Sequence, residues 1–143
     1  MSFEPTPAYS GFQAGQAGRA YNEAAFRHFL AIDQWQAARS RRSVLLVLVS
    51  LRRTIGGSAK LTDDAAAAIF KGLGDCVREI DFVGWFREGY VAAAVLVQAN
   101  KPSGDPSHLL AGRILPAIRR QLSAEQARRL RVRIVRLAGG KRN

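Results

Sequence analysis

The chain has 143 residues, of which 48% are apolar, and it carries a formal net charge of +11. That length allows one compact domain with its own core. The single cysteine, Cys76, excludes an internal disulfide and a multi-cysteine metal site, and His28 and His108 lie too far apart in sequence to show metal-ligand spacing. The longest apolar run, Val44–Val49, is far shorter than the ~20 residues of a membrane-spanning helix, and the N-terminus lacks a secretory signal. We therefore expect a cytoplasmic protein without membrane insertion.

The positive charge is concentrated in the last third of the chain. From Arg113 to the C-terminus there are ten basic residues and one acid, Glu125, which gives this segment a net charge of +9. Such a surface favours an anionic partner such as a nucleotide, a nucleic acid, an acidic lipid or an acidic protein. A solvated arginine-rich face accounts for it equally well. Nucleic acid is the weaker interpretation, because no aromatic residues interleave these arginines.

The N-terminal half predicts a tail, a helix and a strand. Residues 1–20 combine proline and glycine with small and polar side chains, without apolar periodicity, and predict a disordered tail. Apolar residues at helical spacing predict a helix over residues 22–39, with Asn22 as its N-cap. The continuous apolar run Val44–Val49 predicts a strand that is buried on both faces.

A second helix and a hairpin follow. Thr62 or Asp63 is expected to cap a helix that runs to about Arg78. The segments Phe82–Phe86 and Tyr90–Val97 then flank a short turn with glycine, which predicts a β-hairpin. Alternation along the first of these strands places one of its two aromatic residues, Trp85 or Phe86, in the core and the other on the opposite face.

The C-terminal part predicts a helix that starts at Asp105 or Ser107 and is kinked or broken at Pro116. Ser123 with Gln126 forms a capping-box pattern for a short helix. Alternating residues then predict a strand over 131–137, and residues 139–143 form a basic tail. The order of elements predicts an α/β (α+β) sandwich over residues 21–138, with a βαββαβ core, a mixed sheet and a preceding N-terminal helix.

This order and three local patterns resemble the GGDEF family of diguanylate cyclases, which has the palm-like nucleotidyl cyclase fold. Asn22–Phe26 is similar to the Asn-Arg-x-x-Phe start of the family's first helix. Asp63 and Arg78 are fifteen residues apart, as are the family's substrate-loop aspartate and the arginine before its signature. Arg78–Asp81 is then separated from the turn by five residues.

The resemblance implies an inactive domain. In active members the first strand ends in an aspartate that helps to hold a divalent metal, and Ser50 stands at that position here. The Gly-Gly-Asp-Glu-Phe signature falls on five other residues: Arg87, Glu88, Gly89, Tyr90 and Val91. Phosphoryl transfer in this family depends on metal held by paired carboxylates. Without them we expect no enzyme activity, no metal and no cofactor, and Glu88 is more simply a charged residue at a hairpin tip.

The resemblance also implies a ligand. An Arg-x-x-Asp five residues before the signature is the family's inhibitory site for cyclic di-GMP, and Arg78 with Asp81 has that spacing. Arginine can donate to a phosphate or to guanine O6 and N7, and a carboxylate can accept from guanine N1 and N2. The alternative is a local ion pair at a helix end. A further arginine usually supports such sites, and the sequence offers Arg113, Arg119 and Arg120.

Two further assignments stay open. Asp63 aligns with a residue that reads guanine in active members, but an acid in a first helical turn needs no ligand. The expected function is a catalytically inactive regulatory module, with cyclic di-GMP as the candidate ligand. A protein-interaction or homodimerisation domain without nucleotide binding is the alternative.

Overall fold

The structure is a computed structural model that describes residues 9–13, 19–40, 42–77, 81–98 and 107–138. One strand order, β1-β2-β4-β5-β3-β6, joins six strands in a single sheet. The strands are β1 (Tyr9–Gln13), β2 (Arg19–Tyr21), β3 (Ser43–Leu51), β4 (Phe82–Arg87), β5 (Val91–Gln98) and β6 (Leu130–Ala138). The helices are α1 (Glu23–Ser40), α2 (Asp63–Gly74), α3 (Ser107–Arg119) and α4 (Ala124–Arg128).

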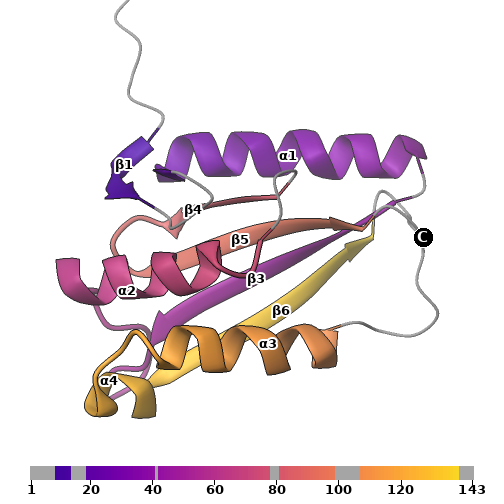
Figure 1. Ribbon diagram of the computed structural model, residues 1–143. Coiled ribbons are helices and arrows are strands. Elements are labelled where there is room, and N and C mark those ends of the chain that lie inside the picture. Colours follow the sequence, from indigo (N-terminus) through magenta and orange to yellow (C-terminus); the bar gives the residue numbers. More distant parts are fainter. Residues whose placement is uncertain (1–8, 14–18, 41, 78–80, 99–106, 139–143) are drawn as a thin grey trace, which may run out of the picture.

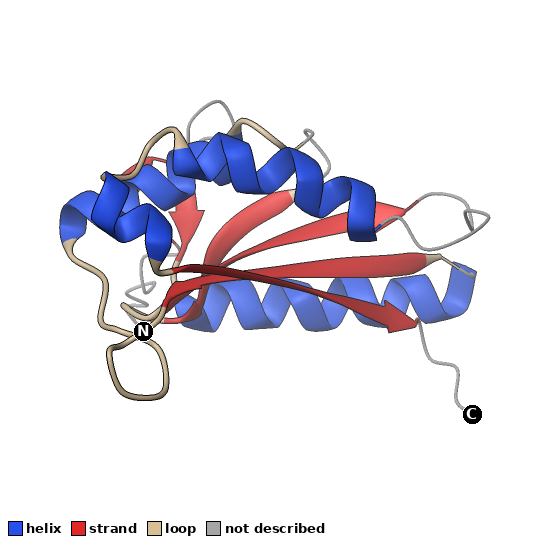
Figure 2. Cartoon of the chain, turned by 90° about the horizontal axis from the view of Figure 1, so that it is seen from below, coloured by secondary structure: helices blue, strands red, loops and turns tan. Residues whose placement is uncertain are grey.

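The helices lie on both sides of the sheet. Figures 1 and 2 show α1 on one face and α2 and α3 on the other. β2 and β4 run parallel, and the remaining neighbouring strands run antiparallel. The predicted α/β sandwich with a mixed sheet and a preceding helix is therefore confirmed. No helix among the described residues is both long and apolar enough to cross a bilayer.

β3 is the central strand of the fold. It pairs with β5 from Ser43 to Val49 and with β6 from Ser43 to Leu51. Because its side chains alternate between the two faces, a continuous apolar run suits a strand that is covered on both sides. Nearly all of its residues are buried, which confirms the prediction from Val44–Val49.

The sheet separates two apolar clusters. The larger one lies between the sheet and α2 and α3, and contains Phe70 and Trp85, whose rings meet edge to face at 5.0 Å. The smaller one lies under α1 and contains Phe26, with Phe86 packed against it. Trp85 and Phe86 thus lie on opposite faces, as their alternation predicted.

The predicted helix caps are present. Asn22 Oδ1 accepts the N–H of Ala25 at 2.9 Å, and Thr62 Oγ1 accepts the N–H of Ala65 at 3.1 Å. Ser123 and Gln126 form the predicted capping box at the start of α4. α2 ends at Gly74, before the expected boundary near Arg78, which itself lies outside the described residues.

One expectation from the sequence is wrong, and a second is wrong in part. The predicted disordered tail contains β1 and β2, and Tyr21 of β2 pairs with Gly84 of β4. Short strands that pair at a sheet edge need no apolar periodicity of their own, so the sequence pattern does not show them. α3 also continues through Pro116 to Arg119. Pro116 removes only one helical hydrogen bond, close to the C-terminal end, and the helix is not broken there.

We expect Gly72→Ala to destabilise the fold. A Cβ at Gly72 in α2 would lie 2.8 Å from Cα and Cγ1 of Ile118 in α3. Such overpacking typically costs about 1–3 kcal/mol, more than the ~1 kcal/mol gained in helix propensity. Gly112→Ala is the matched control, because no heavy atom lies within 4 Å of its added Cβ, and it should stabilise α3. Urea unfolding measures both variants, and stabilisation of both would contradict the close helix contact.

Candidate functional site

The turn between β4 and β5 is a plain hairpin tip. The N–H of Tyr90 donates to the carbonyl of Arg87 at 2.9 Å, and Gly89 has a φ of 82°, a conformation that glycine adopts without strain. The guanidinium of Arg87 stacks over the Tyr90 ring at 4.5 Å. The N–H of Leu61 donates to the carbonyl of Gly89 at 2.8 Å, which ties the segment before α2 to the tip. Val91 begins β5.

Glu88 joins the hairpin tip to the start of α1. Its carboxylate accepts the N–H of Glu23 at 3.0 Å, and the carboxylate of Glu23 accepts the N–H of Glu88 at 2.7 Å. Glu23 also forms an ion pair with Arg27, whose guanidinium lies 4.2 Å from the centre of the Phe86 ring. This geometry gives Glu88 a structural role at a helix N-terminus, where a carboxylate is favourable.

Ser50 lies near the end of β3 and is buried. The residues beside it, Leu51 and Arg52, bring no carboxylate. In the part of the chain that the structure describes, no three histidine, cysteine or acidic side chains are grouped as metal ligands.

Asp63 and Asp81 lie at opposite ends of the sheet. Asp63 is an exposed residue in the first turn of α2, beside the hairpin tip. Asp81 immediately precedes β4, at the far end of the hairpin, and is only 7% exposed. The two carboxylates therefore belong to different sites.

Asp81 is held against β5. Its Oδ1 accepts the backbone N–H of Val97 at 3.3 Å. It also lies near Asp33 of α1, since its negative charge contributes to the raised pKa of that carboxyl. Arg78, the predicted partner of Asp81, lies outside the described residues.

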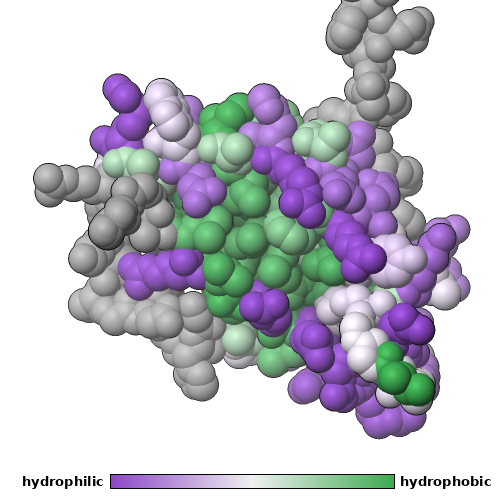
Figure 3. All heavy atoms as spheres, turned by 180° about the vertical axis from the view of Figure 1, so that it is seen from behind, coloured by the Kyte–Doolittle hydropathy of each residue, from purple (hydrophilic) through white to green (hydrophobic). Residues whose placement is uncertain are grey.

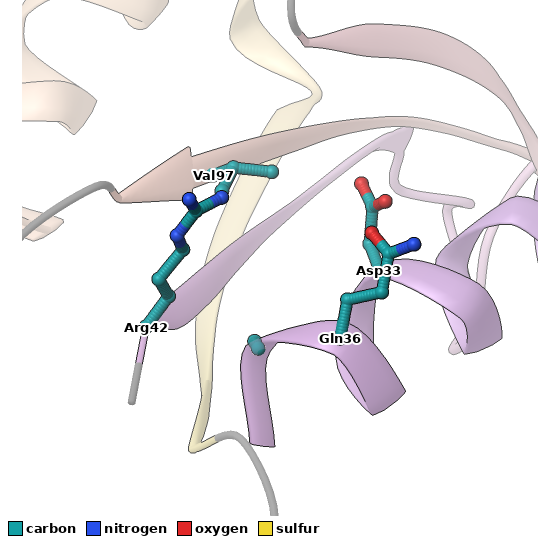
Figure 4. A pocket seen from close by; sticks show the side chains of 5 residues that line it. Asp33, Gln36, Arg42 and Val97 are labelled. Atoms are coloured by element: carbon teal, nitrogen blue, oxygen red, sulfur yellow. The ribbon is translucent and has the colours of Figure 1, made fainter. Parts of the chain in front are cut away.

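A hollow of about 200 Å³ opens beside Asp81. We call it the Asp33 hollow, and it is lined by Asp33, Gln36, Ala37, Arg42 and Val97. Figure 4 shows Asp33 and Gln36 side by side on α1, and Arg42 across from them at the start of β3. A carboxylate, an amide and a guanidinium thus line one hollow, from opposite sides, at the end of the sheet where Asp81 lies. Together they can accept from and donate to the edge of a purine base.

Burial is the main reason why the pKa of the Asp33 carboxyl is raised, and the charge of Asp81 is the second reason. Both causes disfavour the ionised form of Asp33. A ligand group that donates hydrogen bonds would relieve this cost, because it would stabilise the negative charge.

The three predicted supporting arginines belong to α3 and the turn after it, on the other face of the sheet. Arg113 and Arg120 lie near Cys76. Burial raises the pKa of the Cys76 thiol, and the positive charges of these two arginines partly offset that rise. Arg119 is exposed at the last residue of α3. None of the three lines the Asp33 hollow, where Arg42 is the arginine among the described lining residues.

Sequence reasoning missed Asp33, Gln36 and Arg42. Asp33 and Gln36 are three residues apart and thus neighbours on one side of α1, a spacing that the sequence shows. Nothing in the local sequence indicates that this side meets the start of β3 and the end of β5. That meeting depends on the pairing of β3 with β5.

We expect Asp33→Asn to stabilise the protein at pH 7. A carboxyl with a raised pKa in the folded state costs stability when it is ionised, and the cost fades as the pH falls toward the unfolded value of 3.8. The gain in thermal midpoint should therefore be present at pH 7 and absent near pH 3. Asp64→Asn is the control, since it removes a favourable acid from the first turn of α2 and should lower stability. A lower midpoint for Asp33→Asn at pH 7 would contradict this account.

No family model matches the chain, and no curated protein matches it. Solved structures do. A DGC protein from Thermotoga maritima has 18% sequence identity and a TM-score of 0.60, over 82% of this chain and 80% of that chain. The GGDEF domain of DgcB from Caulobacter crescentus, in complex with c-di-GMP, has 13% identity and a TM-score of 0.61, over 94% of this chain and 79% of that chain.

The FimX GGDEF domain from Pseudomonas aeruginosa is similar in the same way. It has 13% identity and a TM-score of 0.59, over 92% of this chain and 84% of that chain. At such identities the likeness shows the fold alone. Together with the sheet order and the position of the helices, it shows that the chain has the GGDEF-like fold that its sequence pattern predicted.

Proposed function

We propose that this chain is a GGDEF-like regulatory domain without cyclase activity, and that it binds cyclic di-GMP at the Asp33 hollow and Asp81. The observation that carries the proposal is the position of Asp81. Its buried carboxylate is fixed by the Val97 N–H beside a hollow that also presents Asp33 and Arg42. The fit of c-di-GMP to the shared fold is supported by the DgcB domain, which was solved in complex with it.

The chemistry of the hollow suits one guanine base. A carboxylate accepts from guanine N1–H and N2–H, and a guanidinium donates to O6 and N7. About 200 Å³ is less than the roughly 300–1,000 Å³ of pockets that enclose a whole small ligand. One base therefore enters, and the remainder of the ligand lies outside, where the net charge of +11 favours its phosphates.

The loss of cyclase activity is supported by three positions. Ser50 and Gly89 stand where the family's metal-binding acids are expected, and neither can hold a divalent metal as a carboxylate does. Glu88, the acid that directly precedes Gly89 in the chain, already accepts the N–H of Glu23. The proposed role is thus to sense a nucleotide rather than to make one.

Calorimetry with cyclic di-GMP tests the binding site. Arg42→Ala, Asp81→Asn and Arg78→Ala should each weaken binding by about tenfold or more, because a hydrogen bond to a charged group contributes about 1.5–3 kcal/mol. Asp81→Asn keeps an oxygen acceptor for the Val97 N–H, so it removes the charge and keeps this hydrogen bond. Arg53→Ala, an exposed arginine in the loop after β3, is the control and should bind as the unaltered protein does. No heat at tens of micromolar ligand, or unchanged binding by Asp81→Asn, would refute the site.

A turnover assay tests the absence of catalysis independently. Purified protein that is incubated with GTP and Mg²⁺ should form no cyclic di-GMP, because Ser50 and Gly89 stand where the carboxylates that hold the metal against the phosphates are expected. Product that accumulates in proportion to protein concentration would overturn this part of the proposal and leave the binding site to be judged by calorimetry.

A further inference from the structure

Among the described helices, α1 covers one face of the sheet, whereas α2 and α3 cover the other (Figures 1 and 2). Neighbouring strands are about 4.8 Å apart, so six strands form a sheet about 24 Å wide. A helix with its side chains is only about 10–12 Å across. α1 packs against β2, β4 and β3 and also touches β6. It leaves side chains of β3 and β6 on this face only partly buried, and no other described helix packs on them.

This partly covered area is apolar. On β3, Leu48 is partly exposed, and on β6 so are Val135 and Leu137, whose side chains share the α1 face. Leu30 borders the area from α1. Figure 3 shows this side of the molecule, with hydrophobic residues gathered in its centre and hydrophilic residues around them. We call the area formed by Leu30, Leu48, Val135 and Leu137 the β6 apolar face.

Arginines border the β6 apolar face. Arg133 pairs with Leu48 and Arg131 with Ser50, so both point to the same side as Val135. Both are exposed. The border is therefore basic. It disfavours contact with another basic surface and favours contact with an acidic one.

We propose that the β6 apolar face docks an acidic amphipathic helix of a partner protein. The helix would lie beside α1 over β3 and β6, at the usual helix spacing of about 8–10 Å. Its apolar stripe would cover Leu48 and Val135, and its acids would face Arg131 and Arg133. A second copy of this chain fits less well, because its own β6 apolar face would bring the same arginines together. This proposal does not depend on nucleotide binding.

The test uses a fluorescent 18-residue peptide with leucines on one helical stripe and glutamates elsewhere. Fluorescence anisotropy in 150 mM NaCl should show saturable binding, with affinity about tenfold lower for a peptide of the same composition in scrambled order. The salt weakens attraction between exposed charges, so a net charge of +11 alone does not produce the difference. Equal binding of the two peptides, or no binding at all, would overturn the proposal.

Matched variants locate the binding surface. Arg133→Glu should weaken peptide binding about tenfold, whereas Arg119→Glu, the same charge change on α3, should have little effect. Val135→Ser should weaken binding, whereas Ile55→Ser should not, because Ile55 is 84% exposed in the loop after β3. Arg133 is exposed, so Arg133→Glu should fold even if Val135→Ser does not, and it then tests whether the peptide binds at the β6 apolar face. Sedimentation that shows a dimer, dissociated by Arg133→Glu, would assign the face to a second copy and refute the partner helix.

Discussion

β3 pairs along its length with β5 on one side and β6 on the other, and it is buried on both faces. Its branched and aliphatic side chains contribute to both apolar clusters. Removal of these side chains from water is the dominant stabilising term in such a fold. Because the strands on either side take their register from β3, the positions of the hairpin tip and of the Asp33 hollow both depend on this strand.

The β4–β5 hairpin separates two regions of different chemistry. At its tip, Glu88 and Glu23 exchange hydrogen bonds with backbone N–H groups, and carboxylates there serve to join elements. At its open end, Asp81 and Asp33 lie close enough for one charge to raise the pKa of the other. The Asp33 hollow lies at this open end, and it is the end at which we propose that a ligand binds.

The two faces of the sheet differ in how completely they are covered. α2 and α3 meet at Gly72, where the helix backbones approach closely, and the core beneath them is largely sealed. On the other face α1 is the one described helix that covers the sheet, and apolar side chains of β3 and β6 remain partly exposed beside Arg131 and Arg133. A nucleotide site at the end of the sheet and a docking face along β6 would let one small domain bind two partners at once.

The sequence by itself determined the elements whose signals are local. The apolar run of β3, the caps at Asn22, Thr62 and Ser123, and the glycine turn of the hairpin all depend on neighbours in the chain. Their order was enough to predict the α/β sandwich, and with three local residue patterns it indicated the GGDEF-like fold. Asp81 was identified from its spacing within a family pattern, although its burial was not.

Only the tertiary structure decided the features that depend on contacts between distant parts of the chain, namely the edge strands and the residues of the Asp33 hollow. β1 and β2 are strands because β2 pairs with the edge of β4, a contact between residues far apart in sequence. Arg42 joins Asp33 and Gln36 because β3 and β5 pair beneath α1, whereas the arginines of α3 and its following turn lie on the opposite face. Local sequence patterns carry the period of an element but not its neighbours in space. They therefore predicted the fold and drew attention to Asp81, and they missed the side chains that line the hollow beside it.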